Sequence, residues 1–368
     1  MRKGMFALAA VGLLATSSMA ACGDDSSDTP SGGASGAASA GKVGVILPDT
    51  KSSQRWGTDD PKFLKAAFDA AGVQVDIQNA QGDKAAFQTI ADGMISSGVK
   101  VLMIVNLDSG TGKAVLDKAK NAGIATIDYD RLTLNGGANY YVSFDNVEVG
   151  KLQGQGLVDC LTKANVTNPT VAYLNGSPTD NNATLFKEGY DSVIKPKFDD
   201  KSYTKGPDES VPDWDNAQAG TIFEQMLTSN KNIKGVLAAN DGLGNAAIQV
   251  LKKNKLNGQV PVTGQDATVQ GLQNVLAGDQ CMTVYKAIKK EADAASELAI
   301  ALAKGQTPTT ATGVTKDTES GKDVPSVLLK PESITKETVK NVIADGFVTK
   351  DAVCTADFAK FCTEAGIS

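Results

Sequence analysis

Short apolar segments alternate with amphipathic stretches along most of this 368-residue chain, and this alternation limits the folds that it can adopt. The first apolar segment, 42–47, reads KVGVIL, and the helical pattern of 61–71 that follows it ends at Gly72. Gly98 and Gly123 close two further helical stretches, each directly before a new apolar segment. A glycine that ends a helix before each strand is typical of repeated strand–helix units. We therefore predict an α/β fold with mainly parallel sheets.

The alternation restarts near residue 140 and continues to about residue 304, so the chain contains two successive sets of strand–helix units. Segment 99–105 is almost entirely apolar, as expected for a strand in a sheet that helices cover on both faces. The length also suits two lobes better than one core. We predict two doubly wound, Rossmann-like lobes. Strands are predicted at 42–47, 73–78, 99–105, 124–129, 140–144, 170–174, 235–239, 260–263 and 283–285, and helices at 61–71, 84–97, 111–122, 148–161, 183–193, 216–227, 243–253, 269–277 and 289–304.

The first 22 residues have the pattern of an export signal: a basic start, an apolar run at 5–14 that is too short to span a bilayer, and small residues that lead to Cys22. The segment Ser-Met-Ala-Ala-Cys resembles a bacterial lipobox, with Met19 where leucine is usual. We favour a lipoprotein signal, cleaved so that Cys22 becomes the lipidated N-terminus, over a plain secretory signal. Residues 23–41 are rich in Ser, Gly, Ala and Asp and are predicted to form a flexible tether.

Four cysteines remain if Cys22 carries lipid, and an exported location permits disulfides. Cys354 and Cys362 are close in sequence, so their pairing is favoured, and Cys160 with Cys281 would complete the set; four cysteines still allow three connectivities. The sequence contains no C-x-x-C motif and no D-x-[DN]-x-[DN]-G calcium loop. We therefore predict no metal and no cofactor.

Charge and residue composition disfavour several function classes. The formal net charge of −6 disfavours a nucleic-acid partner, because phosphate contacts need clustered lysine and arginine. The chain has no histidine, which removes the commonest general base, the usual Ser-His and Cys-His pairs and the commonest metal ligand. Enzymes without histidine exist, but its absence makes a catalytic function less favoured.

Polar side chains follow the predicted strands directly, at the point where each strand ends. In open α/β sheets, ligands bind in the crevice beyond the carboxyl ends of the strands. These residues are therefore candidates for a shared site. They are Asp49, Arg55 and Trp56 after 42–47, Asp130 and Arg131 after 124–129, Asp180, Asn181 and Asn182 after 170–174, Asn240 and Asp241 after 235–239, Gln265 and Asp266 after 260–263, and Lys286 after 283–285.

Such a set suits a sugar. Each sugar hydroxyl donates and accepts, so charged and amide side chains can bind it, and the apolar C–H faces can stack on Trp56 or Trp214. Each residue also has a simpler explanation. Asn240-Asp241 and Gln265-Asp266 could be helix caps, Asp130-Arg131 a local ion pair, and either tryptophan a core or hinge contact. Their joint placement at one sheet edge favours the binding site.

Six short segments of the sequence resemble those of a known family. The similar segments are Tyr129-Asp130-Arg131, Ser143-Phe144-Asp145-Asn146, Gly176 to Ala183 (GSPTDNNA), Asn240-Asp241, Gly264-Gln265-Asp266-Ala267 and Met282 to Lys286 (MTVYK). In this order they look like segments of the ribose/galactose class of type I solute-binding proteins, periplasmic D-xylose-binding proteins in particular. The resemblance runs from about residue 43 to 347 and departs from the family in the extra cysteines, the tether and the longer tail.

The resemblance implies a type I periplasmic-binding-protein fold with a three-segment hinge, crossing near Asp145, Lys286 and 324–327. We predict a first lobe of 42–144 plus 287–324 and a second lobe of 145–286 plus 325–368. The family's sugar contacts fall on the following positions of this chain: Arg55, Trp56, Asp130, Arg131, Asn182, Trp214, Asn240, Asp266 and Lys286.

These features predict an extracytoplasmic lipoprotein, anchored to the outer face of the cytoplasmic membrane, that delivers D-xylose to the permease subunits of an ABC importer. It is expected to be a monomer. The alternatives are a binder of ribose, arabinose, glucose or galactose, a sugar sensor coupled to a membrane receptor, and a carbohydrate-active enzyme that uses carboxylates such as Asp130 and Asp266. A transcriptional regulator of the same fold would need a helix-turn-helix where this chain has its export signal and tether.

Overall fold

The computed structural model describes residues 41–367. The predicted signal peptide, the lipidation site Cys22 and nearly all of the predicted tether lie outside the described residues. Among residues 41–367, no helix has the length and apolar character needed to cross a bilayer.

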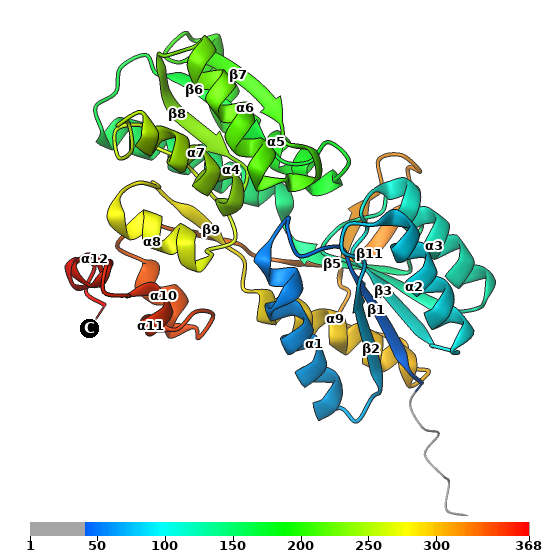
Figure 1. Cartoon of the computed structure of the whole chain (residues 1–368). Helices are drawn as coiled ribbons and strands as arrows, with labels where there is room; N and C mark the ends of the chain where they lie inside the picture. The colour runs from blue at the N-terminus through cyan, green and yellow to red at the C-terminus, as the bar shows by residue number, and fades with distance from the viewer. Residues whose placement is uncertain (1–40, 368) are drawn as a thin grey trace, which may run out of the picture. The chain divides into compact units, whose positions relative to one another are not determined.

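The first lobe is built on a seven-stranded sheet in the order β10-β11-β5-β4-β3-β1-β2 (Figure 1). All neighbouring strands are parallel except β10 and β11, which pair antiparallel. The strands are β1 (Val43–Leu47), β2 (Val75–Asn79), β3 (Val101–Ile104), β4 (Ala125–Tyr129), β5 (Tyr140–Phe144), β10 (Gly313–Lys316) and β11 (Asp323–Leu329).

Helices cover both faces of this sheet, because successive side chains of a strand point to opposite sides. Val45 of β1 packs in one apolar cluster with α1 (Asp59–Ala70) and α9 (Ile288–Ala303). The next residue, Ile46, packs in a second cluster with α2 (Lys84–Ser96) and α3 (Ser109–Asn121). The doubly wound arrangement predicted from the apolar strands is therefore present.

The second lobe contains β6 (Thr170–Asn175) between β7 (Thr204–Ser210) and β8 (Ile233–Ala238), all parallel. Single bridges link Val236 to Val262 and Gln265 to Val284, and β9 (Thr283–Tyr285) pairs antiparallel with β12 (Glu332–Ile334). The helices of this lobe are α4 (Asn146–Lys163), α5 (Asn181–Asp199), α6 (Asn216–Ser229), α7 (Asp241–Lys253) and α8 (Val269–Ala277). The predicted strand at 260–263 is wrong, because this segment forms only the single bridge from Val262 to Val236.

Two glycines allow α4 and α5 to pack at close range. A Cβ at Gly150 would collide with the carbonyl oxygen of Phe186, and a Cβ at Gly189 with that of Val147. Larger residues at these positions would force the helices apart, so this contact depends on the sequence of both helices.

The chain passes between the lobes three times: after β5, after β9 and after β11. The first and third passages lie side by side, because the amide of Asp145 donates to the carbonyl of Leu329 at 2.9 Å. The sequence predicted the third crossing near 324–327. These residues belong to β11, which pairs with β5 as far as Leu329, so the passage comes after that residue and 325–329 lie in the first lobe.

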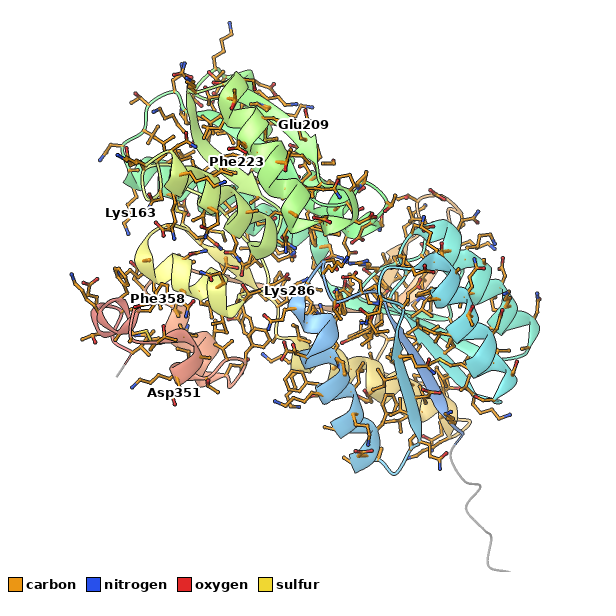
Figure 2. All side chains as sticks on the ribbon, viewed as in Figure 1. Lys163, Glu209, Phe223, Lys286, Asp351 and Phe358 are labelled. Carbon is orange, nitrogen blue, oxygen red and sulfur yellow. A yellow bond between two sulfur atoms is a disulfide. The ribbon has the colours of Figure 1, made fainter. Side chains whose placement is uncertain are left out.

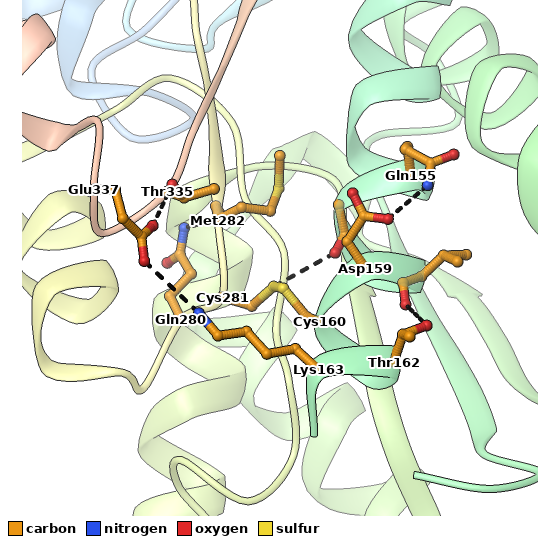
Figure 3. Close-up of a disulfide and its surroundings, with 12 residues drawn as sticks. Gln155, Asp159, Cys160, Thr162, Lys163, Gln280, Cys281, Met282, Thr335 and Glu337 are labelled. Atoms are coloured by element: carbon orange, nitrogen blue, oxygen red, sulfur yellow. Dashed lines mark hydrogen bonds and ion pairs between the residues drawn. A yellow bond between two sulfur atoms is a disulfide. The ribbon is translucent and has the colours of Figure 1, made fainter. Parts of the chain in front are cut away.

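The C-terminal tail forms three short helices: α10 (Val339–Ala344), α11 (Lys350–Val353) and α12 (Ala359–Glu364). They bury Val339, Val353 and Cys362 against α8. A disulfide joins Cys354 to Cys362, and a second joins Cys160 of α4 to Cys281 before β9 (Figure 3). This is the connectivity that the sequence spacing favoured.

Candidate ligand-binding site

A pocket lies where the strand ends of both lobes meet. All nine residues predicted as sugar contacts line it, so the structure brings the complete predicted set together. Figure 2 labels Lys286, which lies where the chain passes from β9 to α9. The lining residues are Ser52, Ser53, Arg55, Trp56, Asp130, Arg131, Asp180, Asn182, Phe186, Trp214, Asn240, Gln265, Asp266 and Lys286.

Arg55 is the most heavily engaged side chain of the pocket. It lies in a short 3₁₀ helix, η1 (Gln54–Gly57), which follows β1. Its Nε and Nη2 donate to the two carboxylate oxygens of Asp60 at 2.8 and 2.7 Å. Nη2 also donates to Glu291 Oε2 at 2.6 Å, and Nη1 donates to Asp130 Oδ2 at 2.9 Å. The guanidinium is therefore fixed from three sides by carboxylates.

Asp130 and Asp266 occupy matching positions in the two lobes. The amide of Asp130 donates to the carbonyl of Val142 and the amide of Asp266 to that of Val284, both at 2.8 Å. Both residues have left-handed backbone conformations, with φ of 63° and 99°. Such conformations are uncommon for residues other than glycine and cluster at functional sites. Lys286 lies close to both carboxylates, with Nζ 3.4 Å from Asp266 Oδ1 and 3.9 Å from Asp130 Oδ2.

The surroundings of Asp130 keep it ionised. Burial alone would raise the pKa of its carboxyl, but Lys286, Arg55 and Arg131 together hold this pKa below its usual range. A charged carboxylate in a buried pocket is a strong acceptor for a ligand hydroxyl.

The two tryptophans are buried and fixed by polar neighbours. The guanidinium carbon of Arg55 lies 4.1 Å from the ring centroid of Trp56, and that of Arg131 lies 5.8 Å from it. Trp214 ends a second 3₁₀ helix, η2 (Pro212–Trp214), and its indole Nε1 donates to Asp180 Oδ2 at 3.0 Å. Both indoles line the pocket and present apolar surface to it.

Asn182 and Asn240 have a structural contact as well as a place in the pocket. The amide group of Asn182 donates to the Asp130 backbone oxygen at 3.0 Å and to Oδ1 at 3.1 Å. Asn240 caps α7, since its Oδ1 accepts from the amide of Leu243. The simpler explanation of Asn240 as a helix cap is therefore also correct, and the cap orients the side chain at the pocket wall.

Asp241 lies next to Asn240 but takes no part in the pocket lining. Its carboxylate accepts from Gln280, Thr268 and Thr283 and joins the starts of α7 and α8 to β9. Burial raises the pKa of Asp241 to about 7, against these hydrogen bonds. Among the described residues, no group of three or more His, Cys, Asp or Glu side chains is placed to hold a metal ion.

Sequence reasoning missed three of the lining residues, Ser52, Ser53 and Phe186, and it left the candidates Asp180 and Gln265 out of the predicted sugar contacts. Asp180 and Gln265 stand among the strand-end residues, but the sequence offered no reason to choose them over their neighbours. Phe186 lies in α5, four residues after Asn182. Since residues four apart share a helix face, this spacing was the available signal.

Comparison with known proteins shows the family. A family model described as "Periplasmic binding protein domain" matches residues 43–307. The D-xylose-binding periplasmic protein of Escherichia coli is 38% identical over 308 residues, which cover 83% of this chain and 90% of the relative. The Haemophilus influenzae protein of the same name is 35% identical, covering 85% and 92%. A multiple sugar-binding periplasmic receptor of Rhizobium radiobacter is 36% identical, covering 84% and 91%.

Solved structures show the same fold. A carbohydrate transporter solute binding protein from Chloroflexus aurantiacus, in complex with D-glucose, aligns with a TM-score of 0.76 and 30% identity, covering 84% of this chain and 97% of the other. A solute binding protein from Clostridium phytofermentans with bound β-D-glucose aligns with a TM-score of 0.76 and 28% identity, covering 85% and 99%. The predicted fold is confirmed, and the chain belongs to the periplasmic binding protein family, with the type I fold of its sugar-binding members.

Proposed function

We propose that this chain is the binding protein of an ABC importer and that it captures one monosaccharide, D-xylose, in the pocket between its lobes. The observation that carries the proposal is the lining of that pocket: charged and amide side chains from both lobes surround two indole rings. The names of two relatives at 38% and 35% identity support D-xylose as the sugar.

The chemistry of the pocket matches a small polyhydroxylated ring. Asp130 and Asp266 can accept from sugar hydroxyls, while Arg131 and Lys286 can donate to them. Trp56 and Trp214 can cover apolar ring faces. Most of the lining side chains are charged, amide or hydroxyl groups, and the aromatic ones are Trp56, Phe186 and Trp214, which suits a small polar ring.

Lobe closure would make the bound state recognisable to a transporter. Asp130 belongs to the first lobe and Asn182 to the second, so one ligand in this pocket would contact both. A ligand that interacts with both lobes favours the closed form over the open one, because only the closed form makes all the contacts. The permease can then distinguish loaded from empty protein by shape.

Calorimetry of the purified chain against D-xylose, L-arabinose, D-ribose, D-glucose and D-galactose tests the proposal. We expect D-xylose to bind most tightly and Asp266→Ala to weaken it by at least about tenfold, since an unpaired group in a closed cleft costs about 1–3 kcal/mol. The control Asp323→Ala makes the same change at an exposed position outside the pocket. Absence of binding by every sugar would refute the proposed ligand class.

A hexose is the second candidate, because the aligned Chloroflexus and Clostridium proteins were solved with glucose. Tighter binding of D-glucose than of D-xylose in the same panel would select it. We also propose that the chain binds sugar without turning it over. Release of nitrophenol from a chromogenic pentoside would contradict this.

We further propose that Cys22 is lipidated and holds the protein at the outer face of the cytoplasmic membrane as a monomer. The small residues before Cys22 and the Ser/Gly-rich segment after it support this. Cys22→Ala should move the protein from the membrane fraction to the soluble fraction. Equal partitioning of the variant and the parent would contradict the anchor.

A further inference from the structure

Arg55 has little capacity left to contact a sugar. A guanidinium carries five N–H groups, and four of those of Arg55 donate to Asp60, Asp130 and Glu291. Only one N–H, on Nη1, remains for a ligand. The main effect of Arg55 on the site is therefore exerted through Asp130, whose Oδ2 it holds at 2.9 Å.

Among the carboxyls that pair with Arg55, Glu291 has the fewest hydrogen-bond partners. It stands in the first turn of α9 and is completely buried. Its Oε2 accepts from Arg55, whereas its Oε1 is buried without a hydrogen-bond partner. The charged and titratable groups around it are Arg55 from η1, Asp60 from α1, Tyr129 and Asp130 from the end of β4, Tyr141 from β5, and Lys286 before α9.

The charges in this buried group do not balance if every member is ionised. Arg55, Lys286 and Arg131 supply three positive charges, while Asp60, Asp130, Asp180, Asp266 and Glu291 supply five negative ones, which leaves a net charge of −2. Uncompensated buried charge is costly, and the usual response is that one group takes up a proton. The carboxyl with an unpartnered oxygen loses least by doing so.

We propose that Glu291 is a positioning residue of the ligand site and acts as a neutral carboxylic acid. In this state it accepts a hydrogen bond from Arg55 but carries no negative charge. It therefore does not draw the guanidinium away from Asp130. This inference rests on the proposed sugar-binding function and adds a residue that the pocket lining does not contain.

The titration of Glu291 agrees with this geometry. Burial raises its pKa to about 8, against the attraction of Arg55. Above that pH the side chain ionises, draws Arg55 towards itself and adds negative charge beside Asp130. A sugar that further excludes water from the group should therefore bind less tightly as the pH rises through about 8.

The experiment is calorimetry with D-xylose on the parent chain and on Glu291→Gln and Glu291→Ala. Glutamine copies the shape and the acceptor of the neutral acid, so we expect affinity within about threefold of the parent at pH 7. Alanine removes the acceptor, so we expect a loss of about tenfold or more. The matched control is Glu297→Ala, on the exposed face of the same helix, which should leave affinity unchanged. Between pH 7 and 9 the parent should lose affinity, while Glu291→Gln should not.

Three results would overturn the inference: full affinity in Glu291→Ala, equally weak binding by the Gln and Ala variants, or the parent's pH dependence retained in Glu291→Gln. The Gln pH profile serves as the test if the Ala variant does not fold, which circular dichroism would show. A parent chain that binds no sugar would instead refute the proposed function, and this inference with it.

Discussion

Lys286 Nζ lies 3.4 Å from Asp266 Oδ1, and the same ammonium group is 3.9 Å from Asp130 Oδ2 in the other lobe. Lys286 is buried and stands at the second passage between the lobes. One cation thus separates a carboxylate of the first lobe from a carboxylate of the second. Without it, the two negative charges would face each other across a pocket from which water is largely excluded.

Replacement of Lys286 by methionine should therefore weaken sugar binding by at least about tenfold, because the variant keeps the length of the side chain but leaves both carboxylates without this partner. The measurement is calorimetry with D-xylose at pH 7. Lys290→Met, an exposed position in the following helix, is the matched control. Unchanged affinity in Lys286→Met would show that the bridge plays no part in binding.

The fold could be predicted where apolar strands and glycine-terminated helices alternate. The predicted bounds of β5, α8 and β9 agree with the structure to within a residue. Strand β7 was missed, because its sequence TKGPDES is polar and half-exposed at the sheet edge, so it lacks the apolar pattern of a buried strand. The tail helices were missed because each is six residues or fewer, too short for a helical period to be visible.

The site could be predicted because strand ends converge at one sheet edge, which made Asp130, Asp266 and Lys286 candidates together. The roles of Asp180 and Glu291 could not, since they depend on contacts with Trp214 and Arg55 from segments distant in sequence. Periodicity describes neighbours along a helix or strand and carries no information on such pairs.

Asp180 should be essential for the arrangement of the second-lobe side of the pocket. Its Oδ2 accepts from Trp214 Nε1 at 3.0 Å and pairs with Arg131 Nε at 3.1 Å, while its Oδ1 accepts from the amide of Asn182. Asp180→Ala removes all three contacts, so we expect sugar affinity to fall by about tenfold or more.

The control for Asp180 is Asp215→Ala, which removes the N-cap of the next helix, α6, without touching the pocket lining. It should cost about 1 kcal/mol of stability and leave the affinity unchanged. If both variants bind as the parent does, Asp180 is only a helix cap.

The two disulfides should contribute unequally to stability. Cys160 and Cys281 are 121 residues apart, and Cys354 and Cys362 are 8 apart. The loop-entropy relation gives about 5 kcal/mol for the long loop and about 2.5 kcal/mol for the short one. We expect the double serine variant of Cys160 and Cys281 to unfold at a clearly lower urea concentration than that of Cys354 and Cys362. The reverse order would mean that the tail contributes more through packing on α8 than through chain entropy.

Three buried carboxyls should make the protein less stable as the pH rises from 5 to 8. Burial raises the pKa of Asp128 and Asp241 to about 7 and that of Glu291 to about 8, whereas in the unfolded chain these groups titrate near their usual values of about 4. Within this interval the folded state binds more protons than the unfolded state, so the free energy of unfolding falls as the pH increases.

Each group that is protonated only in the folded state contributes a slope of up to about 1.4 kcal/mol per pH unit. Urea denaturation at pH 5, 6, 7 and 8 measures the total. Asp128→Asn should reduce the slope without affecting sugar binding, since Asp128 contacts Thr133 and does not line the pocket. Stability that is constant or rises from pH 5 to 8 would mean that these carboxyls are ionised in the folded protein. Burial of Glu291 would then not be enough to keep its carboxyl protonated.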